Sequence, residues 1–260
     1  MVSESRNPVG PHVGIFATCL VDLMRPVVGF ATADLLIKAG CRVDVPEVQT
    51  CCGQPAYNSG DLINAQEIAK QVIAAFEGFD YVVVPSGSCG GTVKKHYPEM
   101  FADDPNWYAR AQKLSDKTFE LTQFLTDVLQ SHPDTTNWDM RVTYHDSCSG
   151  LRELGIKAQP RKLLDNVSGM TVIEGKEAET CCGFGGLFCI KYGEISEQIV
   201  SAKVDDIAAS GADMVLGGDL GCLMNIAGRL KRLGSDTEVR HIAEVLADMQ
   251  DTAAIGESEA

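Results

Sequence analysis

Two pairs of adjacent cysteines, each followed by glycine, are the first feature of this 260-residue sequence that indicates chemistry. The pairs stand in QTCCGQP, residues 49–55, and in ETCCGFG, residues 179–185. A direct disulfide between neighbouring cysteines is strained, because their side chains diverge along the backbone. Two adjacent thiolates can instead bind one metal centre. Since the chain has ten cysteines in all, the pairs favour metal binding or redox chemistry.

Eight of the cysteines repeat with nearly one offset, between 129 and 133 residues. Those of the first half are Cys19, Cys51, Cys52 and Cys89, and their counterparts are Cys148, Cys181, Cys182 and Cys222. The apolar runs VGIFATC and RVTYHDSC match in the same way, as do YVVVPSGSC and DMVLGGDLGC. We therefore predict an internal duplication with its seam in SHPDTTNWD, residues 131–139, and two domains, 1–135 and 136–260.

The elements that must position these cysteines alternate between strands and helices. In the first half we expect strands at 13–18, 41–46 and 81–85, and helices at 21–39 and 61–78, the second helix capped by Asp61. The second half repeats the order in RVTYHD, PRKLLDNV, MTVIE, EISEQIVSAKVDDIAAS and MVLGG, followed by helical LMNIAGRLKRLG and HIAEVLADM. This alternation predicts the α/β class, with two similar Rossmann-like parallel sheets.

On this scheme every cysteine of the repeat follows a predicted strand. The carboxyl ends of parallel strands meet along one edge, where ligands are usually bound, so four thiolates from three segments are predicted to converge in each half. Four sulfur ligands suit zinc or an iron–sulfur cluster. Structural zinc sites favour paired Cys-x2–4-Cys knuckles, and the ordinary ferredoxin run of cysteines is absent here.

The whole arrangement, C-x31-CC-x36-C and then C-x32-CC-x39-C, resembles the cysteine-rich CCG domain. That domain occurs in the cysteine-rich component of heterodisulfide reductase and in the iron–sulfur subunits of glycolate oxidase and anaerobic glycerol-3-phosphate dehydrogenase. The segments CRVDVPEVQTCCGQPAYNSGD, VPSGSCGG, ETCCGFGGLF, LGCLMNIAGRL and VRHIAEVLAD are similar to those of the lactate utilization protein A family. The resemblance extends from about Val13 to Met249.

This resemblance implies a role in a complex that oxidises L-lactate to pyruvate, with a ferredoxin-like iron–sulfur subunit and a third small subunit as partners. It implies one or two 4Fe-4S clusters per chain at the eight cysteines, with zinc an alternative at one site. Side chains cannot accept a hydride, and no flavin or nicotinamide fingerprint is found, so we expect a non-catalytic redox subunit of this oxidoreductase. Two alternatives stay open, a heterodisulfide-type thiol–disulfide reductase subunit and a non-redox zinc scaffold.

The sequence departs from the CCG pattern, which usually ends in Cys-x2-Cys. Here Ser86 stands three residues before Cys89, and Asp219 three residues before Cys222. Five-cysteine relatives hold noncubane clusters for thiol–disulfide chemistry, so four cysteines favour one ordinary 4Fe-4S cluster in each site. Asp219 remains a candidate oxygen ligand, with a plain loop acid as the alternative.

Two further residues are candidates near the second site. Cys189 could supply a fifth sulfur there, and the alternative is a buried thiol. His145 stands three residues before Cys148, at a predicted strand end. It could donate a hydrogen bond to a cluster sulfur, and the alternative is a hydrogen-bonded strand-end histidine.

The bulk properties bound the remaining possibilities. A net charge of −14 and a pI near 4.7 disfavour nucleic-acid binding, because the phosphate backbone would repel the chain. No apolar run reaches the roughly 18 residues of a membrane span. The opening MVSESRNPVGPHVG lacks the apolar core of a secretory signal. We therefore expect a cytoplasmic protein with no integral membrane segment.

Overall fold

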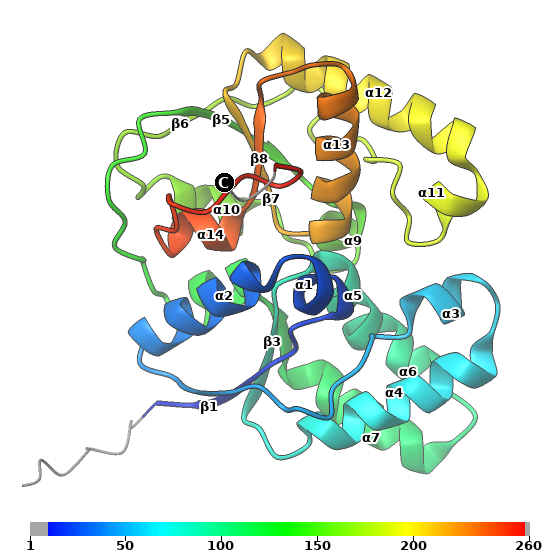
Figure 1. Ribbon diagram of the computed structural model, residues 1–260. Coiled ribbons are helices and arrows are strands. Elements are labelled where there is room, and N and C mark those ends of the chain that lie inside the picture. The colour runs from blue at the N-terminus through cyan, green and yellow to red at the C-terminus, as the bar shows by residue number, and fades with distance from the viewer. Residues whose placement is uncertain (1–9, 258–260) are drawn as a thin grey trace, which may run out of the picture.

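The computed structural model describes residues 10–257 and contains two four-stranded parallel sheets. The first sheet has the order β2-β1-β3-β4 and the second the order β6-β5-β7-β8, so the second half repeats the first (Figure 1). The strands are β1 (His12–Ile15), β2 (Arg42–Asp44), β3 (Tyr81–Val84), β4 (Thr118–Glu120), β5 (Arg141–His145), β6 (Thr171–Val172), β7 (Met214–Gly217) and β8 (Glu238–His241). The predicted α/β class and the internal duplication are confirmed.

Helices connect the strands in both halves, as parallel neighbours require. Those of the first half are α1 (Cys19–Met24), α2 (Pro26–Lys38), α3 (Gln54–Asn58), α4 (Leu62–Phe76), α5 (Gly87–Gly91), α6 (Tyr97–Met100), α7 (Pro105–Lys117) and α8 (Leu121–Gln123), with π-helical turns η1 (Thr92–His96) and η2 (Phe124–Val128). Those of the second half are α9 (Cys148–Arg152), α10 (Ala158–Leu164), α11 (Phe188–Lys191), α12 (Gly193–Ser210), α13 (Leu220–Arg232) and α14 (Ile242–Leu246).

The structure differs from the predicted elements in several places. The helix expected over 21–39 is broken at Arg25, whose backbone is not helical, and Pro26 begins α2. Proline is tolerated in the first turn of a helix but not in its interior, which explains the break. Helix α7 and strands β4 and β8 were not predicted, because PNWYARAQKLSDK is largely polar and TFE and EVRH contain no continuous apolar run. The predicted cap is confirmed, since Asp61 accepts a hydrogen bond from the Asn64 backbone nitrogen at 3.3 Å.

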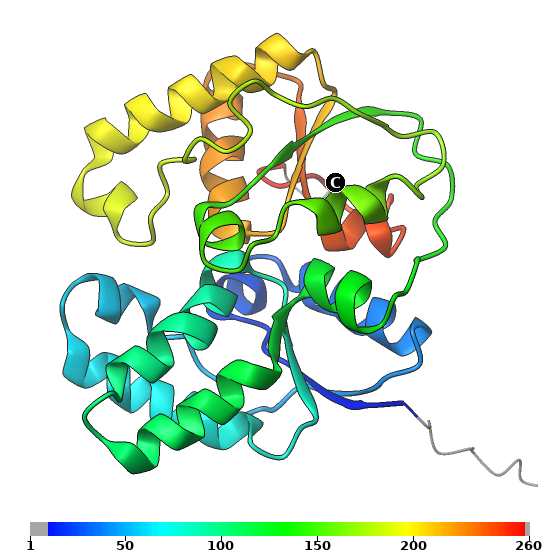
Figure 2. The ribbon, with the colours of Figure 1, turned by 180° about the vertical axis from the view of Figure 1, so that it is seen from behind.

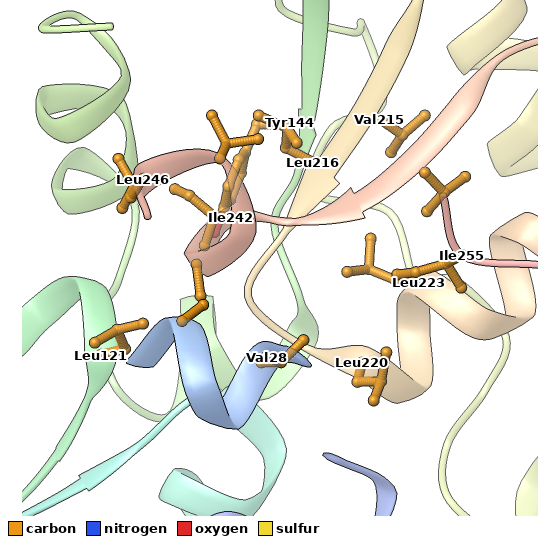
Figure 3. Packing of buried hydrophobic residues seen from close by; sticks show 14 of the residues in the cluster. Val28, Leu121, Tyr144, Val215, Leu216, Leu220, Leu223, Ile242, Leu246 and Ile255 are labelled. Atoms are coloured by element: carbon orange, nitrogen blue, oxygen red, sulfur yellow. The ribbon is translucent and has the colours of Figure 1, made fainter. Parts of the chain in front are cut away.

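The two halves share one core. Helix α2 of the first half packs against α14 of the second, and α8 and η2 pack against α10 (Figures 1 and 2). In the shared cluster, Val28 and Leu121 of the first half lie in one group with Ile242 and Leu246 of the second (Figure 3). The two sheets are thereby held in one body, and the division at 135/136 stays a prediction.

The expectation that no secretory leader precedes the fold rests partly on residues 1–9, which lie outside the described residues. Within residues 10–257, no helix combines the length and the apolar character needed to cross a membrane.

Candidate metal centres

The first candidate centre lies at the carboxyl edge of the first sheet. Cys19 begins α1 after β1, Cys89 lies in α5 after β3, and Cys51 and Cys52 lie in the loop between β2 and α3. The Cys19 thiol donates to the Cys51 sulfur at 3.8 Å. Cys19, Cys51, Cys52 and Cys89 all line one cavity. The structure thus brings together the four sulfurs that the sequence predicts to converge.

The second candidate centre repeats this arrangement at the edge of the second sheet. Cys148 begins α9 after β5, Cys222 lies in α13 after β7, and Cys181 and Cys182 lie in the loop between β6 and α11. All four of these cysteines line one cavity, and the Cys182 and Cys222 sulfurs lie within 4.8 Å of each other. The second set of four sulfurs converges as well.

The glycine of each CCG segment turns the chain so that its own amide faces a sulfur. Gly53 and Gly183 both have φ near +81°, in the left-handed region that favours glycine. The Gly53 nitrogen donates to the Cys51 sulfur at 3.4 Å, and the Gly183 nitrogen donates to the Cys181 sulfur at 3.3 Å. Such amide–sulfur contacts stabilise a thiolate.

The second cysteine of each pair is held by a side chain from a neighbouring helix. The Tyr97 hydroxyl donates to the Cys52 carbonyl at 2.9 Å. In the other half the Asn225 side-chain amide donates to the Cys182 carbonyl at 2.8 Å. Both halves therefore fix the same backbone group, although they use different donors.

In each cluster one thiol is set up to lose its proton. Donation from Cys19 lowers the pKa of Cys51 far below its usual range, and the same shared proton raises the pKa of Cys19. Cys181 and Cys148 form the matching pair, with the pKa of Cys181 lowered and that of Cys148 raised. The thiolate is the form of cysteine that binds metal. Each cluster therefore contains one cysteine whose surroundings already favour that form.

The two positions where five-cysteine relatives have another cysteine are helix caps here. The Ser86 hydroxyl accepts from the Cys89 nitrogen at 3.4 Å, and Asp219 Oδ1 accepts from the Cys222 nitrogen at 3.4 Å. Asp219 Oδ2 accepts from the Ser88 nitrogen at 2.8 Å and from the Ser86 hydroxyl at 3.2 Å. Both carboxylate oxygens of Asp219 are therefore engaged within the protein, and its role as a metal ligand stays a prediction.

The two centres lie side by side across the junction of the halves. The Gly87 nitrogen, ahead of Cys89, donates to the Gly218 carbonyl, ahead of Cys222, at 3.1 Å. A cavity of about 130 Å³ borders the first cluster, and one of about 200 Å³ borders the second. Their common wall is formed by Gln54, Ser88, Phe184 and Gly186.

Phe184 is a residue of this wall that the sequence did not single out. It lies in the glycine-rich run GFGG, residues 183–186. A Cβ atom added at Gly221 would lie 2.4 Å from the Phe184 ring, so the ring rests directly on the backbone of α13 beside Cys222. The only signal in the sequence is an aromatic residue within a glycine-rich loop that follows CCG.

The two remaining candidates differ in their placement. The Cys189 thiol donates to the Gly186 carbonyl at 3.4 Å, and Cys189 is not part of the lining of the second cavity. His145 is only 3% exposed, and one ring nitrogen lies within 4.8 Å of the Cys182 and Cys222 sulfurs. Neither ring nitrogen has a hydrogen-bond partner in the described part of the chain, which leaves the alternative of a hydrogen-bonded strand-end histidine without support.

The chemistry of the donors fits a soft metal centre. All ten cysteines are free thiols, so none of the eight is consumed in a disulfide. The 130 Å³ cavity is several times the roughly 30 Å³ share of a water molecule in the liquid. Thiolate donors select zinc, copper(I) or iron–sulfur clusters. The residues therefore fit either of the two groups that the sequence leaves open, zinc or an iron–sulfur cluster.

Two parallel α/β units with four thiols gathered at the carboxyl edge of each define a duplicated cysteine-rich protein. The family described as CCG, cysteine-rich domain, matches residues 13–94 and 142–227, once in each half. Lactate utilization protein A of Geobacillus sp. (strain WCH70) is 52% identical over 234 residues, which cover 90% of this chain and 98% of the relative. The protein of the same name from Bacillus cytotoxicus is 51% identical with the same coverage. The chain belongs to the lactate utilization protein A family of CCG-domain proteins.

A solved structure supports the fold. The crystal structure of a hypothetical protein from Helicobacter pylori aligns with a TM-score of 0.61 over 97% of this chain and 50% of that protein. Because the two sequences are 13% identical, this similarity concerns the fold alone.

Proposed function

We propose that this chain is a cytoplasmic iron–sulfur subunit that relays electrons in the oxidation of L-lactate to pyruvate. Its relatives carry the name lactate utilization protein A, and the metal-binding part of the proposal rests on the two four-thiol clusters. The observation that carries the relay is the common wall between the two cavities. Clusters bound beside the two cavities would be separated by residues that line both of them, and this short separation favours electron exchange.

The eight converging cysteines would hold a 4Fe-4S cluster in one or both halves, with zinc an alternative in one of them. A bound cluster supplies reversible one-electron chemistry, which the side chains of this chain lack. The amides of Gly53 and Gly183 stabilise negative sulfur, and burial of Cys52 and Cys182, each 2% exposed, excludes water. Both effects are among those that tune the potential of an iron–sulfur centre.

The first centre also borders an open groove at the surface. Cys19 and Cys51 form part of this groove, which has a volume of about 290 Å³. Exposed apolar side chains, Leu23 and Val45, stand at its rim. In the proposed complex the ferredoxin-like iron–sulfur subunit exchanges electrons with this chain here, because Cys19 and Cys51 are only partly buried where they line the groove. A third small subunit completes the assembly.

The test is strictly anaerobic purification, followed by measurement of iron, zinc and acid-labile sulfide with an electron paramagnetic resonance spectrum of the reduced protein. About four iron and four sulfide per occupied half, with a reducible paramagnetic signal, support the relay. Zinc alone, with no reducible centre after reconstitution, would replace it with a structural role. Lactate oxidation by this chain without partners would also overturn it, as would reduction of small disulfides, which would favour the thiol–disulfide alternative.

A further inference from the structure

The second centre contains a buried imidazole that the first centre lacks. His145 ends β5 three residues before Cys148, and Phe16 stands three residues before Cys19 in the first half. Phe16 is completely buried and packs its ring against Phe76 at 5.5 Å between centroids. The same backbone position therefore supplies core packing in one half and a ring with two nitrogen atoms in the other.

Both ring nitrogens of His145 are buried and lack a hydrogen-bond partner among the described residues. Leaving buried polar atoms unpaired costs free energy, so a native structure rarely keeps them without a function. One of these nitrogens and the sulfurs of Cys182 and Cys222 all lie within 4.8 Å of one another. That spacing allows one metal centre to contact all three atoms.

Imidazole nitrogen is a common ligand of zinc and iron. Lys203 does not occupy the ring nitrogens of His145, because its ammonium donates to the Glu177 carbonyl.

We propose that His145 is a direct ligand of the metal centre in the second half. The second centre then has a mixed nitrogen and sulfur donor set, whereas the first has sulfur alone. This inference rests on the proposed function in that it requires a metal in the second half. It also assigns the two centres different character, because an added imidazole nitrogen changes the set of donor atoms that tunes the potential of a metal centre.

The test uses the full-length, anaerobically reconstituted protein, grown with ¹⁵N-labelled histidine. If the second half holds a paramagnetic iron centre, pulsed electron paramagnetic resonance should detect a histidine nitrogen bound to it. If that half holds zinc, X-ray absorption at the zinc edge should resolve a nitrogen near 2.0–2.1 Å beside sulfurs near 2.3 Å. The Cys52→Ala variant, which lacks a ligand of the first centre, assigns the signal to the second.

His145→Phe copies the residue of the first half and should abolish the nitrogen signal. It should also weaken metal binding by more than about 100-fold, beyond the 10- to 100-fold typical of a lost outer hydrogen bond. His145→Cys should restore binding without the nitrogen signal. The matched control is His96→Phe. His96 lines the cavity beside the second cluster, but its ring pairs with Glu99 at 2.8 Å, so this variant should keep the signal.

The possible failures are separable. A second half that holds metal with no histidine nitrogen bound to it overturns the role of His145 and leaves the proposed function standing. A wild-type second half that takes up no metal overturns the role of His145, and the proposed function falls with it only if the first half takes up no metal either. Since the wild-type spectrum alone decides the first point, the inference stays testable even if His145→Phe does not fold.

Discussion

The two halves of this chain use the same backbone design around different interiors. In each, a CCG glycine with φ near +81° directs its amide at a cysteine sulfur, and a donor from a later helix holds the carbonyl of the next cysteine. Behind the sulfurs, the first half has Phe16 where the second has His145. Duplication has therefore kept the thiols and the loop geometry while the lining behind them diverged.

A second difference between the halves is a residue on the helix that packs over each CCG segment. Gly53 packs against Ile68 of α4, and Gly183 packs against Ile199 of α12, which sets an offset of 131 residues between the two helices. At this offset Lys203 takes the place of Val72. Both side chains are buried, so the second half places a cation close to its cysteines where the first has only hydrocarbon. Charge and solvation set the potential of a metal centre, so the two centres are not equivalent.

The largest effect expected from this comparison is the loss of one centre alone. Cys182→Ala should remove metal from the second half and leave the first half loaded, because the two clusters share a wall but no cysteine. Cys52→Ala is the matched variant and should have the opposite selectivity. Metal and sulfide content of both proteins, measured with their spectra, checks this. Loss of metal from both halves in either variant would mean that the centres do not form independently.

The next largest effect concerns an ion pair that joins the two halves. Arg25, between α1 and α2, pairs with Glu244 of α14 at 2.5 Å, and Glu244 is completely buried. Arg25→Ala should lower the free energy of unfolding by about 3–5 kcal/mol, because it leaves a buried carboxylate unpaired. Arg229→Ala, which breaks a pair with the exposed Glu197, should cost no more than about 1 kcal/mol. Equal losses in denaturant unfolding would mean that the junction contributes little to stability.

A third difference between the halves lies in the residue at the end of β4 and of β8. Glu120 and His241 occupy matching positions there, both buried, and each caps the helix that follows. Burial raises the pKa of Glu120 to about 7, and nearby Asp219 acts in the same direction; burial lowers the pKa of His241. The folded protein therefore favours the neutral form of both groups.

The raised pKa of Glu120 gives a pH dependence with a definite sign. Between about pH 4.5 and 7 the folded state binds a proton that the unfolded state has released, so stability falls as pH rises through this window. A shift of this size corresponds to about 3 kcal/mol. Glu120→Gln cannot ionise, so its stability relative to the wild type should improve by about that amount between pH 4.5 and 8. Unfolding curves of the reduced, metal-free proteins measure this, and parallel pH profiles would contradict it.

Much of the candidate site could be predicted because its causes are local. An apolar run ending in cysteine indicates a strand end, and parallel pairing then brings strand ends together. The lining could not be predicted in the same way. Whether His145 meets a cysteine or a hydrogen-bond partner depends on how α12 and α13 pack over β5, and Phe184 lies on Gly221, 37 residues further along the chain. These contacts are set by tertiary packing.

The two helix caps could have been predicted from the sequence. Ser86 and Asp219 each stand three residues before a cysteine and directly before a helix, and serine and aspartate are preferred caps. Comparison with the five-cysteine pattern drew attention to ligation instead. The short strands β4 and β8 lie at the other extreme, because TFE and EVRH become strands only through pairing with β3 and β7.

The smallest effect expected is a difference in the free energy of unfolding between two matched substitutions, one in each CCG loop. Gly53→Ala should lower the free energy of unfolding by about 1–2 kcal/mol, the cost of a left-handed backbone for a residue with a Cβ atom. Its Cβ would lie 3.3 Å from the Cγ2 methyl of Ile68, a side-chain atom that needs to shift by only a few tenths of an ångström. In Gly183→Ala the Cβ would lie 2.7 Å from the Ser196 carbonyl oxygen, a backbone atom within α12 that cannot. Overpacking of this kind adds about 1–3 kcal/mol, so Gly183→Ala should be the more damaging change in unfolding curves of the metal-free proteins. Equal costs would mean that α12 yields as easily as a side chain, and that the second loop is no more tightly packed than the first.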